Sequence, residues 1–215
     1  MPFSGNGTRA LTAPMFLITG HTPGSGKSLL VDVFAVVATG ETAPRMAETG
    51  PEEFEKRITA TLVAGHRLAL VDNCASAVGN SSLDAVLTGP TWEGRELGKS
   101  RNLRLPARTV WFATGNNLKV RNDLARRALM VRLDAKQERP ELRTGFKHAN
   151  LLKHVRDHRV KLVVAALTIC AAYRQAGHPA VTGTGMGSFE SWDVAVRRPL
   201  LWLGMSDPLD TQSTI

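Results

Sequence analysis

The sequence predicts an α/β fold, with helices on both faces of a parallel sheet, followed by a helical C-terminal domain. Apolar runs at residues 15–18, 68–71 and 110–113 are typical of buried strands. Segments with helical spacing separate these runs. Beyond residue 135 the strand patterns stop, while helical patterns continue. Because strands and helices alternate before that point, we expect a three-layer α/β architecture.

A glycine-rich turn joins the first strand to the first helix. Gly24 and Gly26 can adopt positive φ, so successive backbone N–H groups can point toward an anion. A strand, such a turn, and a helix that starts with a lysine and a hydroxyl form the arrangement that binds nucleotide phosphates. We predict that Lys27 reaches the β- and γ-phosphates and that Ser28 ligates Mg²⁺.

The strict form of this motif has a glycine where this chain has His21, and Gly20 stands one place early. The alternative is therefore a chance glycine turn. The sequence of the loop still favours a nucleotide site. The predicted nucleotide-binding residues are His21, Thr22, Pro23, Gly24, Ser25, Gly26, Lys27, Ser28 and Leu29.

The composition limits the possible classes of protein. The 215 residues, 43% of them hydrophobic, can bury one α/β core with a small helical addition. A net charge of +8 suits a polyanionic partner without identifying it. Cys74 and Cys170 offer neither a disulfide framework nor metal-ligand spacing, so we expect buried thiols in a reducing cytosol. The longest apolar run, at 162–172, is too short for a membrane span.

The second buried strand ends in Asp72, at the edge where parallel strands place their functional side chains. We predict that Asp72 holds Mg²⁺ through water, and the alternative is a cap for the next helix. The third strand ends in Asn116, whose amide could orient an attacking water. The adjacent arginines Arg126 and Arg127 follow on a short helix, where they are either solvated or suited to complete the active site of a neighbouring subunit.

Residues 88–108 are polar and rich in arginine, and Gly94 and Gly98 would permit a hairpin. Basic side chains with one aromatic suit a nucleic-acid contact, although a charged surface hairpin is an alternative. The candidate nucleic-acid contacts are Trp92, Arg95, Lys99, Arg101 and Arg104.

The expected organisation has four segments. A flexible lead-in covers residues 1–13, the sheet domain 14–135, a helical domain 136–207 and a loose tail 208–215. Residues 136–146 are charged and contain a proline, which marks the boundary between the two domains. Helical patterns follow at 150–158, 160–175 and 188–203.

These motifs together resemble the additional-strand P-loop ATPases, the AAA+ and superfamily 3 helicase group. More narrowly, they resemble the ATPase modules joined to primase-polymerases in phages and mobile elements. The resemblance covers about residues 15–209. It rests on Pro-Gly-Ser-Gly-Lys-Ser from residue 23, Val-Asp-Asn from 71, Leu-Thr-Gly-Pro-Thr-Trp from 87, Arg-Glu-Leu-Gly from 95, Ala-Thr-Gly-Asn-Asn-Leu from 113, Asp-Leu-Ala-Arg-Arg from 123, Glu-Arg-Pro-Glu-Leu-Arg from 138 and Gly-Ser-Phe-Glu-Ser-Trp from 187.

The resemblance implies Mg²⁺-dependent ATP hydrolysis coupled to translocation on DNA, preferably single-stranded, by a hexameric ring of subunits. It implies a primase or polymerase partner on the same or another chain, in the cytoplasm of a bacterial or phage-infected cell. Lys27 and Ser28 match the Walker A residues, and Asp72 matches the Walker B acid. Asn116, or alternatively Asn117, matches the sensor-1 amide. Either Arg126 or Arg127 matches the arginine finger.

One position departs from the pattern of the group. Most members have a catalytic glutamate directly after the Walker B aspartate, where this chain has Asn73. Either another carboxylate substitutes, with Glu53 and Glu55 as candidates, or hydrolysis is slow. The departure keeps a rival function open, an ATP-binding switch or loader without a motor. A small-molecule kinase is a third hypothesis, because such kinases share the phosphate loop, although Asn116 and the arginine pair fit them less well.

Overall fold

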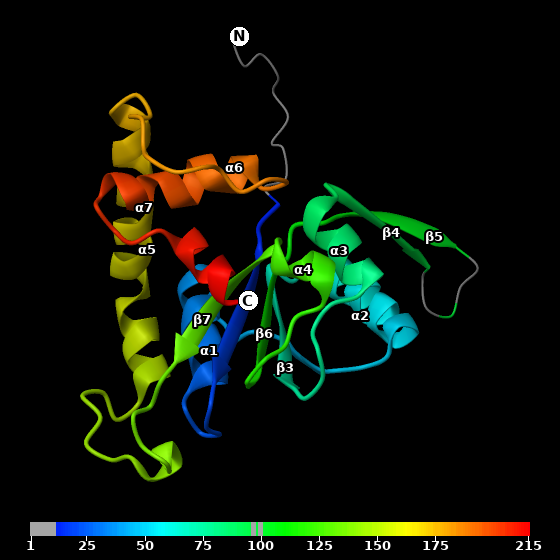
Figure 1. Cartoon of the computed structure of the whole chain (residues 1–215), viewed down its shortest axis with the longest axis horizontal. Coiled ribbons are helices and arrows are strands. Elements are labelled where there is room, and N and C mark those ends of the chain that lie inside the picture. The colour runs from blue at the N-terminus through cyan, green and yellow to red at the C-terminus, as the bar shows by residue number, and fades with distance from the viewer. Residues whose placement is uncertain (1–11, 96–97, 99–100) are drawn as a thin grey trace.

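The computed structural model, which describes residues 12–95, 98 and 101–215, has a five-stranded parallel sheet at its centre (Figure 1). The strand order is β2-β3-β6-β1-β7, so β6 lies between β1 and β3. The strands are β1 (Met15–Gly20), β2 (Arg45–Ala47), β3 (Leu68–Cys74), β6 (Val110–Asn116) and β7 (Ala128–Leu133). The predicted α/β class is confirmed. The lead-in expected at 1–13 lies almost entirely outside the described residues.

Helices cover both faces of the sheet, which is why the central strands are apolar almost throughout. On one face, α1 (Lys27–Thr39) packs Val31 and Ala35 against Ile18 and Phe112. On the other, α2 (Pro51–Val63) and α3 (Ser81–Thr88) pack around Trp111, which is fully buried. Two apolar clusters, one on each side of the sheet, therefore hold its strands in place.

A two-stranded antiparallel hairpin projects from the α2 and α3 side of the sheet, at the right of Figure 1. It consists of β4 (Thr91–Arg95) and β5 (Asn102–Pro106). Along β4 the exposed and buried residues alternate, so one face of the hairpin meets the helices and the other meets solvent. The hairpin that the glycines predict is therefore present.

The C-terminal segment is built around one long helix. α5 (Leu151–Gln175) is continuous where the sequence suggested two helices, and it packs along α1. Arg159 of α5 donates two hydrogen bonds to α1. Its Nε donates to the Val36 oxygen at 3.0 Å, and its Nη2 donates to the Ala38 oxygen at 3.1 Å. These carbonyls belong to the last turn of α1, where helix carbonyls run short of backbone donors, although Val36 O also accepts the Gly40 N–H at 2.9 Å. The contact therefore caps α1 and attaches the helical segment to the sheet.

A buried ion cluster organises the chain after α5. α6 (Glu190–Trp192), the short π-helix η2 (Asp193–Arg197) and α7 (Arg198–Trp202) form one helical segment. Arg197 and Asp193 are both almost fully buried, and Arg197 Nη1 lies 2.6 Å from Asp193 Oδ1. Arg197 Nε also donates to Asp207 Oδ1 at 2.7 Å, and this hydrogen bond lowers the pKa of Asp207.

The C-terminal residues are ordered where the sequence suggested a loose tail. η3 (Pro208–Thr214) is a 3₁₀-helix that lies against β7. Thr211 Oγ1 accepts a hydrogen bond from the Met130 N–H at 3.2 Å, and Gln212 donates to the Ala128 oxygen at 3.2 Å. β7 is an edge strand, and its outer backbone groups need partners. η3 supplies them. Within the described ranges, no helix has the length and apolarity that a membrane span requires.

We expect Asp193→Ala to lower the free energy of unfolding by about 3–5 kcal/mol, because it leaves the buried Arg197 guanidinium short of a partner. The matched control is Asp157→Ala, which breaks the exposed pair with Lys153 and should leave the free energy of unfolding nearly unchanged. Urea denaturation measures both values. Equal losses in the two variants would contradict a structural role for the buried cluster.

Candidate active site at the carboxyl edge of the sheet

The carboxyl ends of β1, β3 and β6 meet at one edge of the sheet, and a cavity opens there. The register pairs Gly20 with Asn116, so the two strand ends lie side by side. The loop between β1 and α1 forms one wall of the cavity, and the ends of β3 and β6 form the other. The lining residues are Pro23, Gly24, Ser25, Gly26, Lys27, Ser28, Leu29, Asp72, Asn73, Thr114 and Asn116.

The loop is shaped by glycines at three positions. Gly24 and Gly26 adopt φ of +70° and +86°, which other residues adopt only with strain. A Cβ on Gly20 would lie 2.8 Å from the Leu133 oxygen of β7 and 3.2 Å from Ser25 Oγ. A glycine is therefore needed at position 20. His21, where the strict motif has its glycine, is exposed and does not line the cavity.

Lys27 connects the loop to the end of β6. Its ammonium group donates to the Thr22 oxygen at 3.0 Å, to Ser25 Oγ at 2.9 Å and to Asn116 Oδ1 at 2.8 Å. Partial burial lowers the pKa of Lys27. Of the two candidate amides, Asn116 is the one that contacts Lys27. Asn117 does not line the cavity; it adopts a φ of +49° and donates its backbone N–H to the Gly20 oxygen.

Asp72 accepts hydrogen bonds from three different elements. Ser28 Oγ of α1 donates to Oδ1 at 2.6 Å, and Thr114 Oγ1 of β6 donates to the same oxygen at 2.5 Å. Arg45 Nη1 of β2 lies 3.2 Å from Oδ2. Burial alone would raise the pKa of Asp72, but the two hydroxyls and the arginine outweigh it and hold the pKa below its usual value. The group is thus an ionised carboxylate near neutral pH.

Thr114 is a site residue that the sequence analysis missed. Its hydroxyl donates to Asp72 and accepts the backbone N–H of Asn73 at 3.0 Å. The signal was a hydroxyl inside an apolar strand, two residues before Asn116 and therefore on the same face of β6.

Asn73 occupies a local irregularity in β3. Its φ is +57°, and the pairing of β3 with β6 shifts register between Val71 and Cys74. Asparagine tolerates this left-handed conformation better than most residues. The irregularity leaves Asn73 exposed at the rim of the cavity, directly after Asp72.

The two proposed substitute glutamates do not lie in the cavity. Glu53 and Glu55 are exposed on the first turns of α2, and Glu53 pairs with Lys56 at 3.6 Å and with Arg57 at 3.4 Å. Neither of them lines the cavity. Among the described residues, Asp72 supplies the carboxylate that lines it. α2 packs on the sheet face opposite α1, whereas the cavity is lined by the first turn of α1, and this accounts for the separation.

A buried carboxylate on α1 extends the network behind the cavity. Asp32 is 4% exposed and forms an ion pair with Arg45, and its Oδ1 has no hydrogen-bond partner among the described residues. Arg45 therefore bridges Asp32 and Asp72 from the neighbouring strand β2. The sequence signal was an acid within the apolar run of the first helix.

Both candidate finger arginines lie at the opposite edge of the sheet. They follow α4 (Asn122–Ala125) at the amino end of β7, where Arg127 O accepts the Met15 N–H. Arg127 is mostly buried and lies 2.7 Å from carboxylate oxygens of both Asp84 and Asp123. Arg126 is largely exposed, with its Nε 2.6 Å from Asp123. Neither can reach the cavity of its own chain, and Arg126 is the more accessible of the two.

The predicted nucleic-acid contacts divide into two groups. The prediction that Trp92 contacts nucleic acid at the surface was wrong. The side chain is 7% exposed, and its Nε1 donates a hydrogen bond to Thr59 Oγ1 on α2 at 2.9 Å. It lies on the inward face of β4, because side chains alternate along a strand. Arg95, Arg101 and Arg104 are exposed on the hairpin, and Arg104 lies 3.8 Å from Glu93. Lys99 lies outside the described residues.

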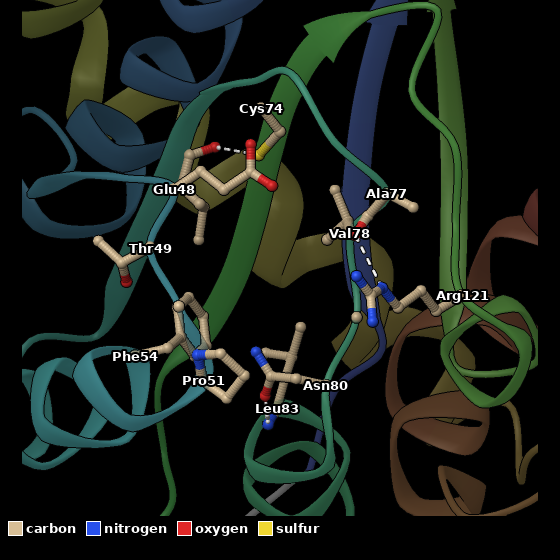
Figure 2. Close-up of a pocket in the computed structure, with 13 residues that line it drawn as sticks. Glu48, Thr49, Pro51, Phe54, Cys74, Ala77, Val78, Asn80, Leu83 and Arg121 are labelled. Carbon is tan, nitrogen blue, oxygen red and sulfur yellow. Dashed lines mark hydrogen bonds between the residues drawn. The ribbon is translucent and has the colours of Figure 1, made fainter.

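A second cavity lies on the α2 and α3 side of the sheet (Figure 2). Glu48 lies at its rim and accepts the backbone N–H groups of Ala75 at 2.9 Å and Ser76 at 3.1 Å, which fixes the loop after β3. Burial, followed by the carboxylates of Glu48 and Asp72, raises the pKa of Cys74 to about 12. Cys74 is therefore a core thiol, as expected from the sequence.

The comparisons with known proteins bear on the fold. Neither the protein-family models nor the curated proteins gave a match. Among solved structures, the chain is similar to the A form of the apo C-terminal region of NrS-1, with a TM-score of 0.50 and 12% identity over 69% of this chain. A second structure of that region gives a TM-score of 0.46 and 12% identity over 71% of this chain. The chain spans 35% of the length of either structure. The likeness indicates a shared fold.

We expect Thr114→Val to lower the free energy of unfolding by about 1–3 kcal/mol, because it removes a hydrogen bond to Asp72 and leaves the Asn73 N–H unpaired. Thr114→Ser keeps the hydroxyl and should retain most of that stability. Urea denaturation measures the loss, and hydrogen exchange at the Asn73 amide should accelerate in the valine variant alone. Identical behaviour of the two variants would refute the role of the hydroxyl.

Proposed function

We propose that this chain is a Mg²⁺-dependent ATPase of the P-loop class that acts as a helicase-like or translocating module in phage or mobile-element DNA replication. One observation carries the proposal: Lys27 hydrogen-bonds to Asn116 and Ser28 to Asp72, and all four residues line one cavity at the edge of the sheet. The position of β6 between β1 and β3 supports it, because additional-strand ATPases have a strand inserted there.

The residues of the cavity fit a phosphate chain with a divalent cation. Gly24, Gly26 and the start of α1 offer backbone N–H groups to an anion, and Lys27 adds a positive charge. Ser28 and Asp72 supply hard oxygen ligands 2.6 Å apart, which Mg²⁺ prefers. Ser28 and Asp72 would hold the Mg²⁺ ion, which would supply positive charge that offsets the charge of the phosphates. Asn116, already hydrogen-bonded to Lys27, would orient the attacking water or the terminal phosphate.

A neighbouring subunit would complete the site in a homo-oligomeric ring. Arg126 is exposed at the sheet edge opposite Lys27, as a residue that reaches into another subunit must be. Arg127, held by Asp84 and Asp123, would support the helix that carries Arg126. Stabilisation of transition-state charge by such an arginine is worth about 10³–10⁵ in turnover in related chemistry.

Asn73 favours a second candidate function, an ATP-binding switch or loader with weak hydrolysis. Among the described residues that line the cavity, none is a glutamate, and an amide cannot accept the proton of the attacking water. In this form, nucleotide binding would drive assembly or loading of a partner such as a primase, and turnover would be slow.

The first test measures ATP binding and hydrolysis with Mg²⁺ and single-stranded DNA. We expect DNA-stimulated hydrolysis in the wild type and a loss of about 100-fold or more in Lys27→Ala, because the variant removes the positive charge at the phosphates. Asn117→Ala is the matched control and should hydrolyse ATP at close to the wild-type rate. Tight binding with negligible hydrolysis in the wild type would select the switch. Equal hydrolysis by wild type and Lys27→Ala would reject the ATPase.

The second test concerns the hairpin. If the hairpin contacts DNA phosphates, Arg95→Ala and Arg104→Ala should each weaken binding to single-stranded DNA several-fold. Each variant should also make the slope of log affinity against log salt concentration less steep by about one, because one fewer counterion is released. Trp92→Phe is the control: it removes the buried hydrogen bond to Thr59 and should lower stability with unchanged DNA affinity. Unchanged affinity and salt slope in both arginine variants would remove the hairpin from the interface.

A further inference from the structure

We propose that the cavity between the first turn of α1 and the segment that precedes α5 holds the base of the nucleotide, with Phe146 as the stacking surface, and that it selects purines. This inference rests on the proposed function, since it assumes that the glycine-rich loop binds the phosphates. It assigns a role to Phe146, which none of the sequence motifs included, and it places Arg143 and Leu29 beside Phe146 in a base-binding wall.

The cavity is continuous with the loop at two points. Leu29, which lines it, directly follows Ser28 and is 41% exposed. On the other wall, η1 (Pro140–Leu142) lies against the loop, so that a Cβ on Gly24 would be 3.1 Å from the Glu141 Cβ. The chain then runs from η1 through residues 143–150 to α5, at the lower left of Figure 1. A ligand held by the loop can therefore extend into this cavity.

The walls of the cavity are apolar and lack a cover. Phe146 is 59% exposed, and Leu29 and Leu151 are also exposed large apolar side chains. Concave apolar surface with a few polar groups is the usual character of a small-molecule site. The guanidinium carbon of Arg143 lies 5.3 Å from the centroid of the Phe146 ring, a cation–π contact that restrains the ring. An exposed and restrained aromatic ring is a suitable platform for a planar base.

The charge of the lining residues further limits the class of ligand that the cavity suits. Arg143, Lys147 and His148 are basic, and no carboxylate lines the described cavity. His148 stacks on His154 with ring centroids 3.7 Å apart, which anchors the segment to α5. Planar apolar surface beside positive charge suits an aromatic ring linked to phosphates. Purines offer more stacking area than pyrimidines, so the platform should prefer them.

The experiment compares Phe146→Ala with wild type in calorimetric titrations of Mg²⁺-ATP and of inorganic triphosphate. We expect ATP affinity to fall about 10-fold while triphosphate affinity is unchanged, because stacking of a base on an aromatic ring is lost. Leu142→Ala removes an equally exposed apolar side chain of η1 that does not line the cavity, and it should bind ATP like wild type. Wild type should bind ATP and GTP several-fold more tightly than CTP and UTP, and Phe146→Ala should lose most of that preference.

The outcomes separate this inference from the proposed function. Wild-type ATP affinity in Phe146→Ala, or equal affinity of wild type for purine and pyrimidine nucleotides, would overturn the base site and leave the phosphate loop in place. Equal weakening of ATP and triphosphate in Phe146→Ala would also overturn it, since the effect would then not involve the base. If Lys27→Ala binds both compounds as tightly as wild type, the proposed function itself fails.

Discussion

The Asp72 carboxylate is the group on which the candidate site depends. It accepts hydrogen bonds from Ser28 on α1 and Thr114 on β6, and it pairs with Arg45 on β2. Three elements far apart in the sequence are therefore fixed around one charge. Taking a carboxylate out of water is unfavourable unless such partners replace the lost solvent. The partners lower its pKa, so the group remains ionised where a cation ligand would need it.

Several backbone irregularities lie at the same edge of the sheet. The loop places Gly24 and Gly26 at positive φ, and β3 changes register at the point where Asn73 turns left-handed. Residues in such conformations persist only where the surrounding packing holds them. Here the packing is the apolar core on both sheet faces, including Trp111 and Ile18. A rigid sheet thus supports an edge whose geometry is set by side-chain contacts.

The helical segment after the sheet contacts both ends of α1, the helix that begins at the site. Arg159 of α5 caps the last turn of α1, and Glu141 of η1 lies against the glycine-rich loop at the other end of that helix. The buried Arg197 cluster then fixes the chain that leads to η3 and the edge strand β7. The Arg159 and Glu141 contacts place the helical segment directly beside both ends of α1.

The sequence by itself determined the α/β class, the glycine-rich loop and the polar strand ends Asp72 and Asn116. These depend on local periodicity and on the rule that parallel strands end at a common edge. Only the tertiary structure decided that Trp92 is buried, that Thr114 joins the Asp72 network and that the last residues cover β7. The physical reason is that burial and hydrogen-bond partners depend on which distant segments pack together, and local patterns carry no such information.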